Sequence, residues 1–170
     1  MNFLLRTYSW LNILGSNGVI NNILNFFHLP KQMFLNTEGA ILLGLVYNFL
    51  PFMILPIYTS LHKIDPKLIE AGQDLGANSK NIFTKIIFPL SIPGVISGIT
   101  MVFMPAITTF VVSNVLGGGT HMLIGNLIEQ QFLRTNNFNF GSALAIILMI
   151  IIVFISILLS LFDKNYEEKK

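Results

Sequence analysis

The stretch "EAGQDLGANSKNIFTKIIFPLSIPG", Glu70 to Gly94, places a polar segment with regular spacing between two long apolar runs. The chain around it has 170 residues, of which 53% are hydrophobic and 11% are charged. A soluble domain carries about 25% charged residues, so this chain lacks the polar side chains needed to cover a soluble core. The composition therefore predicts an integral membrane protein, and we expect the all-α class.

Three segments are apolar and long enough to cross a bilayer: residues 40–61, 88–116 and 141–162. None of them contains Asp, Glu, Lys, Arg or His. A crossing needs about 20 apolar residues, and only a helix satisfies the backbone polar groups inside lipid. Prolines in the first two segments, with Gly94 and Gly98, predict kinked helices that pack closely. The missing ionisable residues argue against an ion-coupled carrier, and the chain has no P-loop motif for ATP.

The basic residues predict the orientation of the chain. The loop 62–87 and the tail 163–170 hold seven of them, Lys63, Lys67, Lys80, Lys85, Lys164, Lys169 and Lys170, against Arg6, Lys31 and Arg134 elsewhere. The positive-inside rule then makes this loop and tail cytoplasmic. We expect a multi-pass protein of the plasma (cell inner) membrane. The segments 1–39 and 117–140 become external loops.

The N-terminal segment 1–39 does not have the order of regions of a signal peptide. We therefore expect the whole chain, 1–170, to be the C-terminal part of a longer transmembrane domain. Apolar residues recur at helical spacing within 20–27, which predicts a short helix in contact with membrane lipid.

The polar segment reads as two short helices joined by a turn. Asp65 and Pro66 are typical of an N-cap and a first helical position, and Gly76 is suited to end that helix. Asn78 or Ser79 can cap the second helix, which leads into the membrane at Pro89. Its small residues would let a partner surface approach: Ala71, Gly72, Gly76 and Ala77. The alternative is a solvated interfacial helix that only anchors the loop.

The segment resembles the EAA loop found in the permease subunits of binding-protein-dependent ABC transporters. The pattern is E-A-A, three residues, G, nine residues and I-x-L-P, and it matches Glu70-Ala71-Gly72, Gly76 and Ile86 to Pro89. Gly72 replaces an Ala, and Phe88 replaces a Leu. The resemblance implies a coupling helix that docks on a cytoplasmic ATP-binding subunit. It assigns the coupling loop to Glu70, Ala71, Gly72, Asp74, Leu75, Gly76, Ala77, Ile86 and Pro89.

Two further stretches are similar to spermidine/putrescine permeases: "LLRTYSWLNILGSNGVINNIL" near the start, and "MPAITTFVVSNVLGGGTHMLIGNLIEQQFL". Asn114 stands where this resemblance leads us to expect an acidic residue. The resemblance implies the last three transmembrane helices of a six-span permease that imports polyamines. It also implies a second permease subunit, an external substrate-binding protein and ATP hydrolysis on a separate chain.

Other readings stay open from the residues themselves. The chain could be a permease for sulfate, phosphonate or iron, or a truncated fragment that transports nothing. We expect no catalytic residues, no cofactor, no nucleic-acid partner and no metal, since His28, His62 and His121 are scattered. Glu38 and Glu129 are the only acids predicted outside, where a polycation could meet them, although ordinary solvation is the favoured interpretation. The residues that contact substrate cannot be identified at this level.

Overall fold

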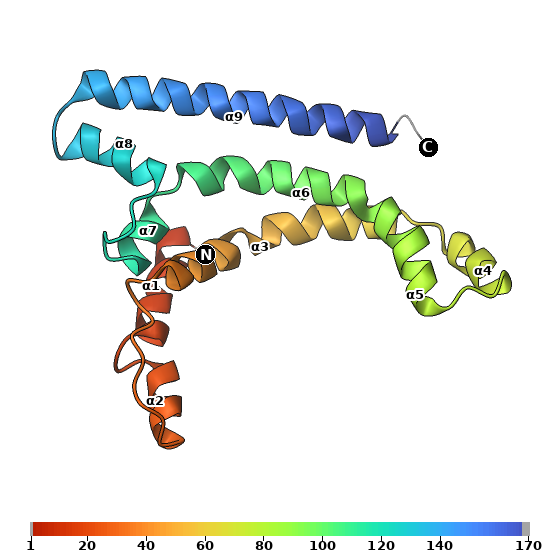
Figure 1. Ribbon diagram of the computed structural model, residues 1–170, viewed down its shortest axis with the longest axis horizontal. Helices are drawn as coiled ribbons and strands as arrows, with labels where there is room; N and C mark the ends of the chain where they lie inside the picture. The colour runs from red at the N-terminus through yellow and green to blue at the C-terminus, as the bar shows by residue number, and fades with distance from the viewer. Residues whose placement is uncertain (1, 168–170) are drawn as a thin grey trace. The chain divides into compact units, whose positions relative to one another are not determined.

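The computed structural model describes the backbone of residues 2–167 and the side chains of residues 2–161, so the side chains of the predicted tail lie outside it. Its elements are α1 (Phe3–Leu14), α2 (Val19–Phe26), α3 (Glu38–His62), α4 (Pro66–Asp74), α5 (Ser79–Ile82), the π-helix η1 (Phe83–Ile87), α6 (Phe88–Thr108), α7 (Val111–Leu116), α8 (Ile124–Leu133) and α9 (Phe138–Glu167) (Figure 1). Every regular element within residues 2–167 is helical, which confirms the all-α class.

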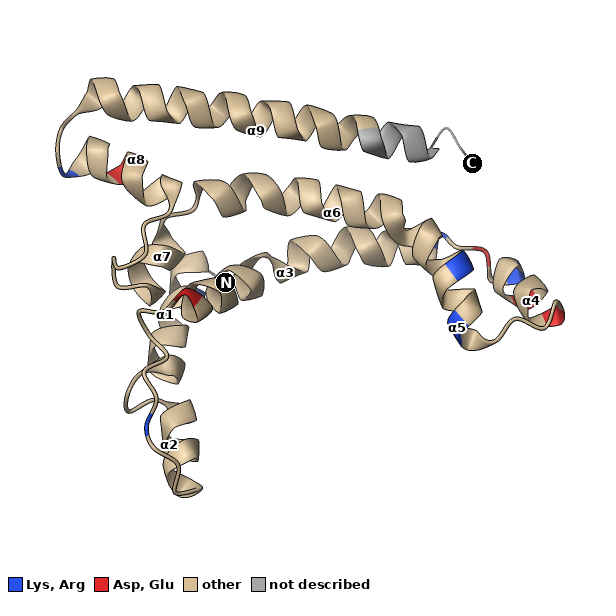
Figure 2. Ribbon diagram, viewed as in Figure 1, with Lys and Arg blue, Asp and Glu red and all other residues tan. Residues whose placement is uncertain are grey.

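Three helical segments are long and apolar enough, by length and composition, to cross a membrane. They are Glu38–His62, Ser79–Thr108 and Phe138–Leu161, with mean hydropathies of 2.1, 2.0 and 3.3. Charged positions are nearly absent from α3, α6 and the described part of α9, and they gather on α4 and α5 (Figure 2). The prediction of three transmembrane helices with a polar loop is therefore confirmed.

One compact unit consists of residues 1–50 and 105–150. Its buried core brings together Leu14 of α1, Ala40 and Ile41 of α3, and Val112 and Leu116 of α7. A Cβ on Gly44 would lie 2.8 Å from Val112 Cγ1 and 2.5 Å from Leu116 Cδ1. The missing side chain thus lets α3 pack directly against α7.

The apolar run 88–116 does not form one helix. It divides between Thr108 and Val111, and the side chain of Val112 beyond the division is fully buried in the core. Phe110 is the N-cap of α7, and its carbonyl accepts the Asn114 N–H at 3.0 Å. The same carbonyl accepts a second hydrogen bond from Asn126 Nδ2 at 3.2 Å, which links α8 to the start of α7. A Cβ on Gly125 would lie 2.8 Å from the Thr108 carbonyl oxygen, so glycine permits α8 to approach this division.

The second unit contains residues 51–104 and the second half of α9. Here α3 and α6 approach closely at two glycines. A Cβ on Gly94 would lie 2.5 Å from Ser60 Cβ and 2.7 Å from the Pro56 carbonyl oxygen, and one on Gly98 would lie 2.7 Å from Met53 Sδ. These contacts account for the small residues in an otherwise bulky apolar sequence.

The π-helix η1 joins α5 to α6 immediately before Pro89. A proline has no N–H, and its ring crowds the carbonyl of the residue four positions earlier, which for Pro89 is Lys85 within η1. A π turn widens the helix by one residue and can relieve that crowding. The helical segment from Ser79 to Thr108 therefore starts inside the predicted loop, ahead of residue 88.

Candidate functional site

The coupling loop expected from the sequence begins with a capped helix. The Asp65 side chain accepts a hydrogen bond from the backbone N–H of Lys67 at 3.0 Å, and Pro66 is the first residue of α4. A proline at this position loses nothing, because the first N–H groups of a helix have no intrahelical acceptor. The helix start is thus fixed by Asp65 and Pro66, as their residue types predict.

The end of α4 is equally well defined. Gly76 has a φ of 78°, in the left-handed region that favours glycine. Its N–H donates to the Gln73 carbonyl at 2.8 Å, and the Ala77 N–H donates to the Gly72 carbonyl at 3.0 Å. This pair of bonds is the Schellman motif, which satisfies the last carbonyls of a helix. Asn78 then caps α5 by accepting from the Asn81 N–H at 2.9 Å.

Gly72 faces the inside of the hairpin formed by α4 and α5 with η1. It is buried, and a Cβ there would lie 2.9 Å from Ile86 Cδ1 and 3.7 Å from Ile82 Cγ1. Gly72 therefore lets α4 pack closely against the following helix. This explains why the position favours a very small residue without invoking a partner protein at that point.

The other residues expected in the coupling loop have different surroundings. Those exposed to solvent are Glu70, Ala71, Asp74, Leu75, Gly76 and Pro89, while Ala77 and Ile86 are half-buried. Leu75 is 89% exposed at the last turn of α4, next to Asp74. The structure brings Gly72, Ala77 and Ile86 together, and it leaves the acidic residues and Leu75 on the surface of the hairpin.

An open groove of about 860 Å³ lies beside the base of this hairpin, within the second unit. Its walls come from α3, the start of α4 and α6, and most of its lining is apolar. Asp65 and Leu68 at the start of α4 line the same groove as Pro56 and Gly94. The hairpin base therefore shares a surface with the contact between α3 and α6.

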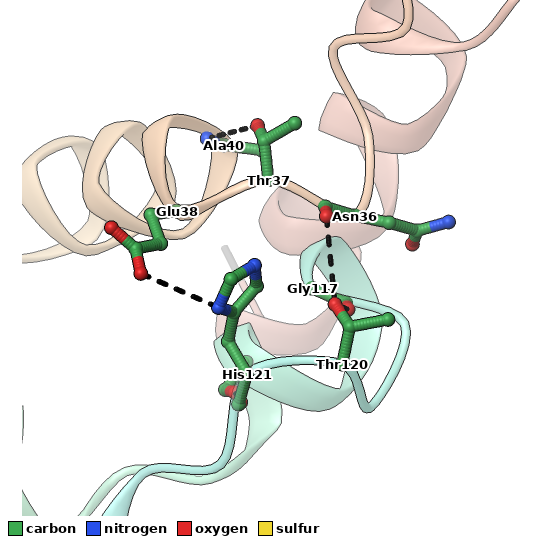
Figure 3. A network of polar contacts seen from close by, with 8 residues as sticks. Asn36, Thr37, Glu38, Ala40, Gly117, Thr120 and His121 are labelled. Carbon is green, nitrogen blue, oxygen red and sulfur yellow. Dashed lines mark hydrogen bonds and ion pairs between the residues drawn. The ribbon is translucent and has the colours of Figure 1, made fainter.

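In the first unit, the glycine turn at 117–119 is tied to the start of α3 (Figure 3). Thr120 Oγ1 donates to the Gly117 carbonyl at 2.6 Å and lies 3.5 Å from the Asn36 carbonyl. Nδ1 of His121 lies 3.5 Å from Oε1 of Glu38, whose side chain is 80% exposed. These contacts hold the turn against the start of α3 and give its residues a structural role.

A second polar network in this unit contains two residues that the sequence singled out separately. Asn114 Nδ2 donates to Glu129 Oε2 at 2.8 Å, and Asn126 Nδ2 donates to Asn114 Oδ1 at 2.7 Å. The Leu123 N–H donates to Asn126 Oδ1 at 3.1 Å. Sequence reasoning missed Asn126. Leu123 and Asn126 do not match the Ser/Thr-x-x-Glu/Gln pattern of a capping box, so no clear signal for it was present in the sequence.

The three histidines have separate local surroundings. His62 stacks on Tyr58 with ring centroids 5.9 Å apart, His121 lies beside Glu38, and His28 has a φ of 58°. Within the described residues, no group of three or more His, Cys, Asp or Glu could hold a metal ion.

Comparisons with known proteins cover almost all of the chain. Residues 5–168 match the family described as binding-protein-dependent transport system inner membrane component. The spermidine/putrescine transport system permease protein PotB of Haemophilus influenzae is 42% identical over 160 residues, which cover 91% of this chain and 56% of that protein. PotB of Escherichia coli K12 is 40% identical over 153 residues, covering 88% and 55%. The chain thus spans about half the length of these relatives.

Two solved structures have the same fold. A bacterial ABC transporter that imports the acidic polysaccharide alginate has a TM-score of 0.78 at 17% identity, over 97% of this chain and 61% of that one. The alginate transporter in complex with a pentasaccharide-bound periplasmic protein has a TM-score of 0.74 at 18% identity, over 99% and 61%. With the family match over residues 5–168, the resemblance predicted from the EAA-like loop is confirmed, and the chain belongs to the binding-protein-dependent transport system inner membrane components.

Proposed function

We propose that this multi-pass membrane protein is a permease subunit of an ATP-driven importer whose substrates are polyamines such as spermidine and putrescine. The observation that carries the proposal is the 42% identity, over 160 residues, to a permease named for spermidine/putrescine transport. The chain spans 56% of the length of that relative.

The proposed orientation places the loop 62–87 and the C-terminus in the cytoplasm. Four lysines, Lys63, Lys67, Lys80 and Lys85, lie in that loop, and cytoplasmic loops of membrane proteins are enriched in Lys and Arg. Segments 1–39 and 117–140 then face the outside. In this proposal the three spans are 40–61, 88–116 and 141–162. The last residues of the second segment form the separate helix α7.

In this orientation α4 is the coupling helix that contacts a cytoplasmic ATP-binding subunit, and all ATP hydrolysis takes place on that subunit. Two features support this role. Glu70 and Leu75 are exposed, and an apolar side chain as exposed as Leu75 at a helix end suits an anchor in a partner's groove. The packing of Gly72 against Ile86 couples α4 to the helical segment that continues into α6.

The remaining proposed partners lie outside and within the membrane. A second permease subunit would complete the pathway, and an external substrate-binding protein would deliver the solute. A structural neighbour of the same fold, described in complex with a periplasmic protein, supports the latter. We expect these two partners to contact the external segments 1–39 and 117–140 or the helix faces that would otherwise contact lipid.

Membrane lipid is the proposed partner of α2 and the turn after it. Phe26, Phe27 and Met33 are 79%, 66% and 84% exposed, although they are large and apolar. Residues 1–37 contain Arg6 and Lys31 but no acidic residue. An apolar face with basic residues nearby suits the interface of a bilayer. The side chain of Asn21, fully buried, holds the other face of α2 by bonding Gln32 and the Gly15 carbonyl.

The test is ATP-driven uptake in vesicles that contain this chain with its permease and ATP-binding partners. We expect spermidine and putrescine, with their binding protein, to stimulate ATP hydrolysis and to accumulate inside. Stimulation by sulfate, a phosphonate or iron but not by polyamines would replace the polyamine proposal with another solute. Assembly with the partners but no uptake of any of these solutes would favour a non-transporting fragment.

A further inference from the structure

The carboxylate of Glu129 has accepting capacity that its surroundings do not use. Its Oε2 accepts one hydrogen bond, from Asn114 Nδ2 at 2.8 Å. A carboxylate offers about four lone-pair sites. Among the described residues, the one ion pair within 4.0 Å joins His121 to Glu38, so none of them gives Glu129 a cationic partner at that distance.

A chain of amides fixes Glu129 in the role of acceptor. The Leu123 backbone N–H can only donate, so Asn126 must present its Oδ1 to Leu123 and its Nδ2 to Asn114 and Phe110. Asn114 Oδ1 accepts the hydrogen bond from Asn126 Nδ2, so the Asn114 amide donates to Glu129 through its own Nδ2. Each amide orientation is thereby set by the one before it. The network therefore directs one amide N–H at the carboxylate of Glu129.

A small cavity borders this carboxylate. It measures about 50 Å³, and its lining includes Asn114, His121, Met122, Asn126, Glu129, Gln130 and Arg134. A cavity of this volume has room for a group of the size of a water molecule, such as –NH₃⁺. An ammonium has three donors, which suit the remaining oxygen lone pairs of a carboxylate.

We propose that Glu129, oriented by Asn114 and Asn126, forms a subsite that binds one terminal primary ammonium of an aliphatic polyamine. The inference rests on the proposed function, and it names a substrate contact in this half of the permease. Glu38 differs from Glu129 in having its Oε1 beside His121 Nδ1 and a side chain that is 80% exposed. Glu38 does not line the cavity, although its partner His121 does, so Glu38→Gln is the control for the loss of an external acid that lies outside the cavity.

Arg134 provides a second and opposite test. It also lines the cavity and is exposed, and no ion pair joins it to Glu129 within 4.0 Å. A positive charge at the rim repels an arriving ammonium, so its removal favours binding of the polyamine. A subsite for a cation therefore requires that removal of Glu129 and removal of Arg134 shift the apparent affinity in opposite directions. A purely structural role of the two residues does not produce this pair of signs.

The experiment measures KM and kcat for spermidine uptake in vesicles carrying the assembled transporter. Glu129→Gln keeps an acceptor for Asn114 and is expected to raise KM about tenfold or more, the scale of one charge-assisted hydrogen bond. Glu38→Gln is expected to leave KM within about twofold. Arg134→Gln is expected to lower KM about two- to threefold at low salt, with the effect reduced at high salt because ions screen exposed charges.

The contradicting outcomes are distinct. If the wild-type complex takes up spermidine and Glu129→Gln leaves KM unchanged, the subsite is overturned while the proposed function stands. The same holds if Arg134→Gln raises KM, or if Glu38→Gln raises it as much as Glu129→Gln does. If the wild-type complex takes up no polyamine, the proposed function itself fails, and the subsite with it. Should Glu129→Gln not assemble, the sign of the Arg134→Gln effect alone decides between the outcomes.

Discussion

Replacement of Gly76 tests whether the shape of the α4 hairpin depends on one backbone conformation. Gly76 has a φ of 78°, and no atom lies within 4 Å of a Cβ built on it. A side chain there meets no steric obstacle, so its cost comes from the backbone alone. For an ordinary L-residue in the left-handed region this cost is about 1–2 kcal/mol. Asn tolerates that region better than other side chains do, so Gly76→Asn is the matched control for Gly76→Val.

The expected effect is local opening of the hairpin. The N–H groups of Gly76 and Ala77 donate to the Gln73 and Gly72 carbonyls at 2.8 and 3.0 Å. A loss of 1–2 kcal/mol accelerates hydrogen exchange of these two amides by a factor of about 5–30. We expect this acceleration in Gly76→Val and a smaller one in Gly76→Asn, measured by exchange mass spectrometry on the assembled complex.

The same variants connect the hairpin to coupling. If α4 transmits the state of the ATP-binding subunit, Gly76→Val should lower the amount of solute taken up per ATP hydrolysed, and Gly76→Asn should retain most of it. Equal exchange rates in the two variants would refute the assignment of Gly76 as a left-handed cap. Accelerated exchange with unchanged coupling would instead refute the role of this hairpin in transmission.

Three further predictions concern a packing contact, a hydrogen-bond network and the membrane orientation. Gly94→Val should lower the free energy of unfolding of the detergent-solubilised complex by about 1–3 kcal/mol, because a Cβ on Gly94 would lie 2.7 Å from a backbone carbonyl oxygen. Gly39→Val should change it little, because the nearest atom to a Cβ there is Thr37 Oγ1 at 3.8 Å, and equal effects of the two variants would contradict the close packing. Asn126→Ala should cost about 1–3 kcal/mol in the same assay through the donors and acceptors it leaves unpaired, and a neutral result would contradict the network. The chain has no cysteine, so Gln73→Cys should react with a membrane-impermeant maleimide from the cytoplasmic side only and Asn25→Cys from the outside only; the reverse pattern would overturn the proposed orientation.

Local chemistry made several elements predictable from the sequence. The long apolar runs predict spans because lipid leaves a backbone few alternatives to a helix. The start of α4 at Asp65 and Pro66 and its end at Gly76 depend on neighbouring residues alone, so their residue types suffice. Gly94 and Gly98 are small among bulky neighbours, and this predicts close packing without identifying the helix that they meet.

Other features depend on residues that are distant in the sequence. The division after Thr108 is stabilised by Gly125 and Asn126 from α8, and nothing within the apolar run marks the position. The inward direction of Gly72 follows from the packing of α4 on Ile86, so periodicity within α4 alone could not separate a partner surface from an internal contact. The contact between Asn114 and Glu129 likewise requires the fold that brings α7 and α8 together.

The central claim is that the exposed end of α4 contacts the ATP-binding subunit. A single cysteine at Leu75, the 89% exposed residue at this end, tests it directly in a chain that has no other cysteine. With a short heterobifunctional reagent that reacts with the thiol at one end and carries a photoreactive group at the other, the assembled complex is expected to give a cross-link between this cysteine and the ATP-binding subunit. Met33→Cys, 84% exposed in the segment proposed to lie outside, is expected to give none. Cross-linking from Met33→Cys, or none from Leu75→Cys in a complex that still hydrolyses ATP, would contradict the account.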